Sequence, residues 1–328
     1  MTRAAGAVEV LELPDVPRRD GIVDVDRLGE LLGPVDLLES ADRSGWTSLV
    51  PHDLATATLG DDAGRVVLRH RSGAEEDLGT DVATALDRVG ARYGLDPSSE
   101  PPPHVPMPFR GGLIGAFAYE LGARLAPGAV PVPPRDGATP PDLALRLTGA
   151  VVAVPRERDR VLLVLDPELL AAPVATVVAA VRDRLRTAGA QAVADAGSDG
   201  PRPTIVTTSL PHDRHAAAVR EVLALIAAGD AYQVNIAQRL RADRVDGVVP
   251  LYRRLRAASP ASHAALLPAA GLASASPERF LRVRAGAVLT DPIKGTRPRA
   301  DDPSLDAALA DDLATSAKDR AENVMVVD

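Results

Sequence analysis

Short apolar runs separated by polar turns follow one another along much of the chain, and this pattern predicts strands. The first hundred residues consist mainly of such runs. Residues 147–166 contain two apolar runs around a charged turn, which predicts a hairpin. Residues 231–240 alternate as in a half-buried strand, and residues 272–296 predict successive short strands with tight turns.

Three other segments have the pattern of helices. Residues 167–189 favour a helix that Pro173 would kink or interrupt. Residues 212–230 carry apolar side chains at helical spacing and stop at Gly229. Residues 304–328 predict one helix, and its apolar end, VMVV, indicates that this end is buried.

Strands and helices are mixed without a regular βαβ alternation, so the pattern predicts an α+β fold. A small, polar stretch at 191–204 is the best candidate for a linker. We therefore expect an N-terminal region over 1–190 and a second region over 204–328.

Composition narrows the classes of function. Hydrophobic residues make up 46% of the 328 residues, enough for a sizeable core, and the formal net charge of -8 argues against a nucleic-acid partner. No apolar run is long enough to cross a membrane. Cysteine is absent, which excludes disulfides and thiolate chemistry and makes a cytoplasmic location the expectation.

Lysine is rare: only Lys294 and Lys318 are lysines among the 37 basic residues. A guanidinium stays protonated, whereas a desolvated ammonium can lose its proton and become a nucleophile or a base. Lys294 stands in the turn-like segment DPIKGT beside a glycine. On residue chemistry alone, a reagent and an ordinary surface lysine are about equally good interpretations.

Two acids complete the candidate chemistry. Lys318 and Glu322 are four residues apart and share a helix face, and a carboxylate there suits a hard cation such as Mg²⁺. A solvated face with a Lys–Glu pair is the more common meaning of this pattern. Glu278 opens the strand that leads toward Lys294, where it would suit proton transfer. Its alternative role is that of a turn acid in solvent.

Five separated segments stand out along the chain: FRGGLIGAFAYELGARL, GDAYQVNIAQRL, LASASPERFLRV, DPIKGTRPRADD and SAKDRAENVMVVD. Together they resemble the chorismate-utilising enzymes, which include anthranilate, aminodeoxychorismate, isochorismate and salicylate synthases. The resemblance extends from about residue 36 to the last residue. It implies an anthranilate-synthase-like antiparallel β-sandwich flanked by helices, with chorismate and Mg²⁺ in a cleft.

Within this family, PIKGT is similar to the aminodeoxychorismate synthase component I branch, while other branches typically have alanine at the position of Lys294. The resemblance implies that the Lys294 amine attacks C2 of chorismate while the C4 hydroxyl leaves, with Glu278 as general acid. Ammonia then attacks C4, and 4-amino-4-deoxychorismate results. An anthranilate- or isochorismate-type synthase that acquired a lysine is the alternative.

The resemblance also assigns binding roles. Gly295 and Thr296 would contact the substrate, Glu322 matches a Mg²⁺-binding glutamate, and Lys318 lies on the same face. Because the chain has no cysteine to hydrolyse glutamine, a glutamine amidotransferase subunit or domain would supply the ammonia.

The sequence departs from the family pattern in two regions. Asp328 falls inside a motif that continues in the family, so we expect a C-terminally truncated chain that is inactive by itself, or a non-catalytic remnant. Leu38, Glu39 and Ser40 match a tryptophan-pocket motif whose following arginine is replaced in SGWTSLV. The loop SPASHAALL also departs from the family, so we expect a structural remnant of that pocket.

Overall fold

The computed structural model describes residues 8–39, 45–62, 64–95, 109–126, 141–187, 206–242, 247–284 and 286–327. The strands are β1 (Glu9–Glu12), β2 (Arg18–Arg19), β3 (Ile22–Val23), β4 (Val35–Glu39), β5 (Trp46–Pro51), β6 (Ala57–Asp62), β7 (Arg65–His70), β8 (Glu75–Asp77), β9 (Gly112–Phe117), β10 (Leu143–Thr148), β11 (Ala150–Pro155), β12 (Leu162–Leu165), β13 (Val206–Thr208), β14 (Leu240–Ala242), β15 (His263–Leu267), β16 (Leu272–Ser276), β17 (Arg279–Arg284) and β18 (Ala287–Asp291). The helices are α1 (Val25–Leu32), α2 (Val82–Arg92), α3 (Leu121–Leu125), α4 (Val174–Thr187), α5 (His212–Ala228), α6 (Val248–Ala258), α7 (Pro303–Thr315) and α8 (Ala317–Val327), with short 3₁₀ turns η1 (His52–Leu54) and η3 (Pro268–Ala270).

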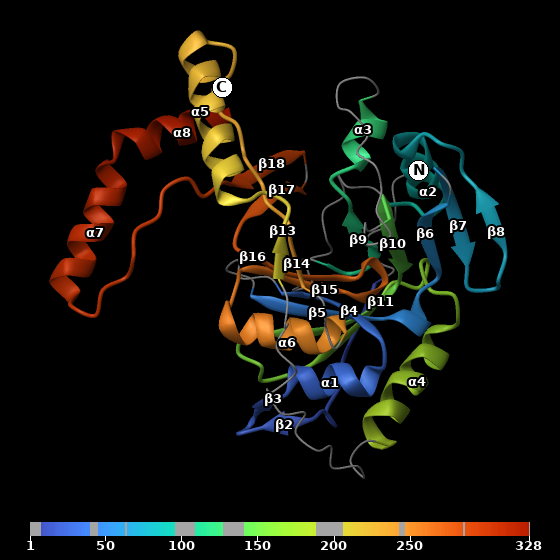
Figure 1. Cartoon of the computed structure of the whole chain (residues 1–328). Helices are drawn as coiled ribbons and strands as arrows, with labels where there is room; N and C mark the ends of the chain where they lie inside the picture. Colours follow the sequence, from blue (N-terminus) through green and yellow to red (C-terminus); the bar gives the residue numbers. More distant parts are fainter. Residues whose placement is uncertain are drawn as a thin grey trace. The chain divides into compact units, whose positions relative to one another are not determined.

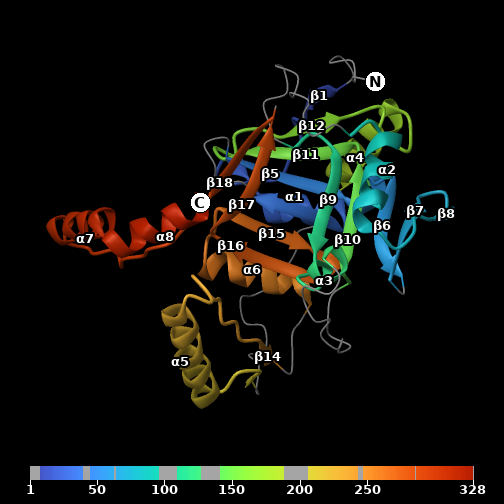
Figure 2. The same cartoon turned by 90° about the horizontal axis from the view of Figure 1, so that it is seen from above.

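Two antiparallel sheets form the larger of two compact units, which comprises residues 1–193 and 255–328. The seven-stranded sheet has the order β1-β12-β11-β5-β4-β15-β16, and the five-stranded sheet has the order β8-β7-β6-β10-β9. Figures 1 and 2 show these strands as blue, green and orange arrows. The mixture of helices with antiparallel sheets confirms the α+β prediction.

The sheets face each other across one apolar core. Val50 and Val151 of the seven-stranded sheet contribute to the same cluster of buried side chains as Ile114 of the five-stranded sheet. On the other side of the seven-stranded sheet, a β-carbon added to Gly29 of α1 would lie 3.5 Å from Leu49, so the helix packs directly on the strand. Figure 1 shows α4 beside α1. The sheets are therefore held in a layered sandwich.

A second apolar cluster covers the outer face of the five-stranded sheet. Leu59, Leu68 and Leu143 of the sheet pack with Val82 and Val89 of α2. The aspartate before α2 caps it, because the Asp81 side chain accepts a hydrogen bond from the Thr84 backbone at 2.6 Å. The helix is thereby anchored at its start and along its apolar face.

Several local predictions are confirmed. β11 and β12 form the predicted hairpin, with Ala150 opposite Leu165. Helix α5 ends at Gly229, which takes the left-handed conformation (φ 82°) that favours glycine. Pro173 interrupts the helical pattern of 167–189, which was one of the two expected outcomes, and does not kink a helix. Helix α4 starts at Val174, so the proline precedes the helix, where its missing N–H costs nothing.

Two expectations were wrong. Residues 231–239 form no strand, since the pairing of β13 with β14 begins only at Leu240. The segment 304–328 forms two helices that are separated at Ser316. Nor is its apolar end buried, because Val324 is 58% exposed.

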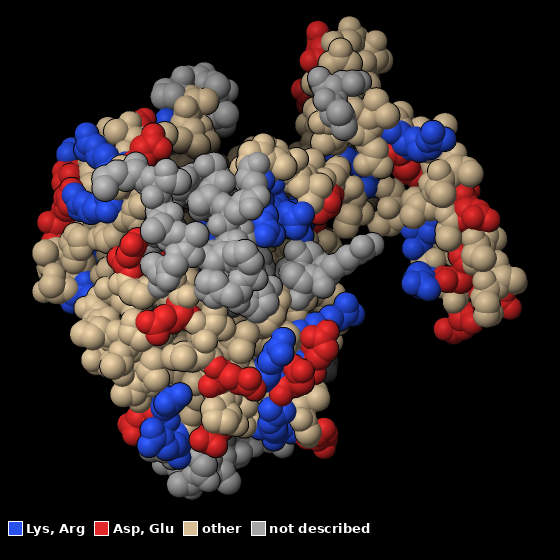
Figure 3. Space-filling model, turned by 180° about the vertical axis from the view of Figure 1, so that it is seen from behind, with Lys and Arg blue, Asp and Glu red and all other residues tan. Residues whose placement is uncertain are grey.

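Several of the elements that follow residue 205 expose apolar side chains. Helices α5 and α7 have no buried residue. On β17, Phe280 is 84% exposed, and on β18, Val288 is 66% exposed. Acidic and basic residues are interspersed over the face seen in Figure 3. No helix in the described part of the chain is long and apolar enough to cross a membrane.

The two regions expected from the sequence share one sheet. Strand β15 pairs with β4, with Ala265 opposite Leu38, and β16 pairs with β15. Residues 263–276 therefore belong to the same sandwich as the N-terminal strands. The smaller compact unit comprises residues 194–254. The linker expected at 191–204 lies outside the described residues.

Candidate active site

The predicted strands before DPIKGT form a hairpin whose open end carries the candidate residues. Arg279 lies opposite Asp291 in the pairing of β17 with β18, and the Arg279 Nε atom is 2.9 Å from Asp291 Oδ2. Glu278 precedes this pair on one strand, and Lys294 follows it on the other. The register thus places both residues beyond the same end of the hairpin.

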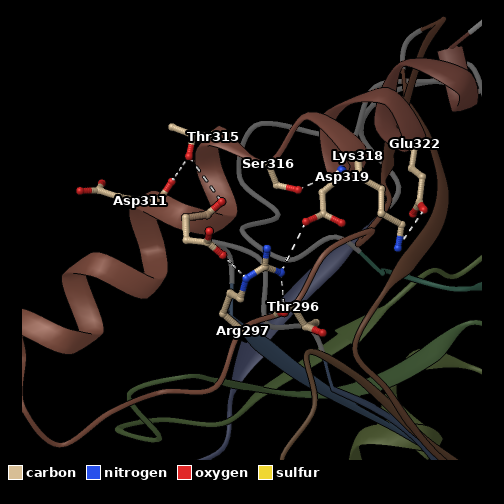
Figure 4. A network of polar contacts seen from close by, with 9 residues as sticks. Thr296, Arg297, Asp311, Thr315, Ser316, Lys318, Asp319 and Glu322 are labelled. Atoms are coloured by element: carbon tan, nitrogen blue, oxygen red, sulfur yellow. Dashed lines mark hydrogen bonds and ion pairs between the residues drawn. The ribbon is translucent and has the colours of Figure 1, made fainter.

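The segment after Lys294 is fixed to the junction of the last two helices by Arg297 (Figure 4). Its Nε donates a hydrogen bond to Asp312 of α7 at 2.5 Å, and its Nη1 lies 3.5 Å from Asp319 of α8. The same Nη1 donates to the Thr296 carbonyl at 3.0 Å. The hydrogen bond to Asp312 raises the pKa of Arg297 above its usual value.

Gly295 is packed against the same junction. A β-carbon added to it would lie 2.5 Å from the Asp319 carboxyl carbon and 2.6 Å from Leu313 Cδ1. Real β-carbons do not approach other atoms so closely, so only glycine fits here without a shift. The residue after Lys294 is therefore a contact point between the loop and both helices.

A second arginine fixes the other end of the loop. Arg299 donates two hydrogen bonds, each of 2.8 Å, to the Asp306 carboxylate of α7. These bonds lower the pKa of Asp306. Asp302 caps α7 by accepting from the Ser304 and Leu305 amides at 2.9 Å. The loop between Lys294 and α7 is thus attached at three places.

The substrate-facing residues expected from the sequence differ in exposure. Lys294 and Gly295 are partly buried, whereas Glu278 and Thr296 are exposed. Backbone geometry at Glu278 is fixed by Ser276, whose hydroxyl donates to the Glu278 carbonyl at 3.1 Å. Within the described part of the chain, Lys294 and Glu278 form no hydrogen bond or ion pair with each other.

Lys318 and Glu322 form the pair that helical spacing predicts. The Lys318 ammonium lies 3.6 Å from Glu322 Oε1, and the side chains are 81% and 31% exposed (Figure 4). Glu322 would offer one carboxylate to Mg²⁺, which commonly takes one or two carboxylates with substrate oxygens and water. The neighbouring Asp319 is already paired with Arg297. Both acids of this helix are thus paired with a basic side chain, and Glu322 is the more exposed of the two.

Nowhere in the described ranges do three or more His, Cys, Asp or Glu residues form a metal-binding group. Arg297 and Asp312, which fix the loop after Lys294 to α7, were not predicted from the sequence. Arginine is too common in this chain to attract notice.

Residues 38 and 39 of the expected tryptophan-pocket motif border a cavity of about 210 Å³. Leu38, Glu39, Trp46, Phe109 and His263 are among its lining residues. The Glu39 carboxylate lies 2.8 Å from the Arg256 guanidinium. Ser40 lies outside the described residues. That this cavity is a structural remnant of a tryptophan pocket stays a prediction.

The sequence of the chain matches a known protein family. A model of chorismate-binding enzymes matches residues 65–328. The chain belongs to this family. The chain is 33% identical to aminodeoxychorismate synthase component 1 of Klebsiella aerogenes, over 70% of this chain and 48% of that protein. It is 35% identical to aminodeoxychorismate synthase of Streptomyces griseus, over 93% of this chain and 40% of that protein.

Anthranilate synthases are similar as well. Component 1 of Streptomyces coelicolor is 30% identical over 99% of this chain and 63% of that protein. The crystal structure of anthranilate synthase component I from Streptococcus pneumoniae matches with a TM-score of 0.63 at 19% identity, covering 90% of this chain and 60% of that chain. The anthranilate-synthase-like fold is thereby confirmed. The chain spans about half the length of the aminodeoxychorismate synthase components that it matches.

Proposed function

We propose that this chain carries the chorismate site of an aminodeoxychorismate synthase component I. The observation that carries the proposal is Lys294, a lysine in a chain of arginines, in a loop that Gly295 and Arg297 fix to the α7–α8 junction. Two relatives that bear this activity in their names, at 33% and 35% identity, support it.

In the proposed reaction, the neutral Lys294 amine forms a bond to C2 of chorismate. The ring double bonds shift, and the C4–O bond breaks. Glu278 gives its proton to the departing hydroxyl, which leaves as water. Ammonia then attacks C4 and the bond between lysine and C2 breaks, so the amine is regenerated and 4-amino-4-deoxychorismate is released. Arginine could not perform the first step because it does not become neutral.

The remaining residues would bind rather than react. Gly295 and Thr296 would lie against the substrate, and Lys318 would attract its carboxylates. Glu322 would hold Mg²⁺, which supplies charge stabilisation for the substrate carboxylate and the leaving group when it is bound. Ammonia would come from a glutamine amidotransferase subunit or domain, and a cytoplasmic location belongs to the same proposal.

The proposal is tested by trapping the lysine adduct. The chain is joined to the part of the Streptomyces griseus relative that lies outside the match, and the joined protein is studied with chorismate and Mg²⁺ in the absence of ammonia. The joined protein should gain the mass of chorismate less one water, on a peptide that contains Lys294. Adding ammonium should discharge the adduct and release the aminated product.

Lys294→Ala and Lys294→Arg should both abolish the adduct in the joined protein. Arg65→Lys, on the five-stranded sheet, changes a basic residue that the proposal does not use and serves as the control that retains the adduct. Unchanged product formation by the Lys294→Ala variant would remove the nucleophile from the proposal.

An anthranilate-type synthase is the second candidate, because the Streptomyces coelicolor anthranilate synthase component matches 99% of this chain. The products separate the two candidates. Anthranilate is fluorescent and lacks the enolpyruvyl group, which 4-amino-4-deoxychorismate retains. Chromatography with mass detection of the ammonium-dependent product therefore decides between them.

A further inference from the structure

A second cavity, of about 210 Å³, lies between the two sheets and is lined by residues from both. Its walls are largely apolar, with Leu59, Ile114, Leu145, Leu267 and Ala270 among them. Small residues make the space: in the five-stranded sheet, Ala144 lies opposite Gly60 on one side and Ala116 on the other. This cavity is lined by different residues from the one beside Trp46.

A buried ion pair crosses between the sheets at this cavity. Arg146 of β10 donates from Nε to Asp36 Oδ2 of β4 at 2.8 Å, and the two side chains are 10% and 4% exposed. The other carboxylate oxygen of Asp36 lies 2.9 Å from His52 Nε2. Both oxygens of the one lining acid are therefore engaged. A buried pair contributes little to stability compared with apolar packing, so stability alone does not account for it.

The basic groups still have donors for a ligand. The contact with Asp36 uses only one of the five N–H donors of Arg146, and Arg146 lines the cavity. Arg69 also lines it, and its Nη1 lies 3.3 Å from the position of a β-carbon on Gly60. Its other contacts are Nε to Glu75 at 2.9 Å and Nη2 to Asp62 at 3.5 Å. The N–H donors that these contacts leave on Arg146 and Arg69 are the groups at this cavity that would hold an anion.

Size and polarity then define the ligand. An apolar cavity of about 150 Å³ is enough to hold benzene. A cavity of 210 Å³ has room for one ring and one carboxylate. An apolar pocket with a few convergent polar groups is also the usual form of a small-molecule site. We propose that the cavity binds a small organic carboxylate with an apolar body of about one ring, held by Arg146 and Arg69. This inference does not depend on the proposed reaction.

The test is equilibrium binding to the 328-residue chain by calorimetry, with the site located by amide chemical shifts. Benzoate is the probe. Benzamide keeps the ring without the charge, and acetate keeps the charge without the ring. Each should bind at least about tenfold more weakly than benzoate, since benzamide lacks the charge that strengthens hydrogen bonds to the arginines and acetate lacks the buried ring. Shifts should centre on residues 36, 60 and 146.

Two variants locate the site without leaving a charge unpaired. Ala269 is exposed and lines the cavity, so Ala269→Leu should obstruct it while Ala269→Ser should not. The double variant Asp36→Leu with Arg146→Met replaces the pair by apolar side chains of similar size, which buried ion pairs commonly tolerate. It should lose at least about tenfold in benzoate affinity and keep benzamide binding.

Absence of saturable benzoate binding to the unmodified chain would overturn the proposal. So would benzoate affinity that neither Ala269→Leu nor the double variant changes. Shifts centred on Phe109 and His263 would place the ligand in the cavity beside Trp46, and would also overturn the assignment.

Discussion

Gly295 and Asp319 are packed so closely that the glycine has no room for a side chain. A β-carbon at Gly295 would lie 2.6 Å from Asp319 Oδ2. Asp319 is also the residue that Arg297 holds on α8. The loop that carries Lys294 and the helix that carries Glu322 are thus joined through one carboxylate, so the position of the loop depends on the position of the helix.

Gly295→Ala should therefore loosen the loop. Overpacking of this kind costs about 1–3 kcal/mol, because the neighbouring carboxylate or Leu313 must move. Native-state hydrogen exchange of amides between residues 295 and 319 measures the change. Gly122→Ala is the control, since a β-carbon there meets nothing within 4 Å. Equal exchange in the two variants would contradict the tight contact.

Arg297→Ala should separate the loop from both helices, because one guanidinium contacts the acids on α7 and α8. We expect faster limited proteolysis near residue 316, where the two helices are divided. Arg297→Lys should give an intermediate cleavage rate, because an ammonium keeps the charge but lacks the planar set of donors with which a guanidinium contacts both acids. Arg65→Ala, which removes the ion pair with Asp77 on the five-stranded sheet, should leave cleavage near residue 316 unchanged.

The residues of this candidate site could be chosen from the sequence, while the contacts that attach the loop to the helices could not. A lone lysine stands out by residue type, and Lys318 with Glu322 follows from helical spacing alone. Arg297 has no such signal, because its role depends on which acids the fold brings near it. The break at Ser316 did have a local signal: in SAKD, the serine accepts from the Asp319 amide at 3.3 Å, as a capping residue does.

Apolar runs are buried where other strands of the same sheet lie on both sides of them. The runs in β11 and β12 are buried throughout because they lie within the seven-stranded sheet. Val324 belongs to an equally apolar run and is exposed. An apolar pattern indicates that a face of a helix or strand favours burial, but it does not identify the segment that packs against that face. The same limit explains residues 231–239, which alternate like a strand and are not paired.

The Asp53–Arg184 pair should make the sandwich sensitive to acid. Burial would raise the pKa of Asp53, but its hydrogen bonds with Arg184 outweigh this and lower it. Because the folded pKa is below the unfolded value of about 3.9, the contribution to stability is present above that value and is lost as the pH falls further. Arg184 also donates to the Leu32 carbonyl at 3.0 Å, so protonation of Asp53 should loosen α4 from α1.

Asp53→Asn should flatten the dependence of unfolding free energy on pH between about pH 5 and pH 2. Urea unfolding at several pH values, followed by the fluorescence of the single tryptophan, measures this slope. Asp87→Asn, which changes an exposed acid of α2, is the control. A slope that Asp53→Asn leaves unaltered would show that the ion pair is unimportant in acid.

Trp46 should be the largest single contributor to the core between the sheets. It is 6% exposed and packs in the same cluster as Val50 and Ile114. Trp46→Ala should lower the unfolding free energy by about 3–5 kcal/mol, because it removes a large buried side chain and leaves a cavity. Trp46→Phe should cost less, since much of the volume remains.

Phe280→Ala is the control for Trp46→Ala, and its unfolding free energy should stay within about 0.5 kcal/mol of the unmodified chain because Phe280 is 84% exposed. Urea unfolding followed by far-ultraviolet circular dichroism compares the three variants without relying on the tryptophan. A loss below about 1 kcal/mol for Trp46→Ala would mean that the neighbouring cavity collapses to fill the space.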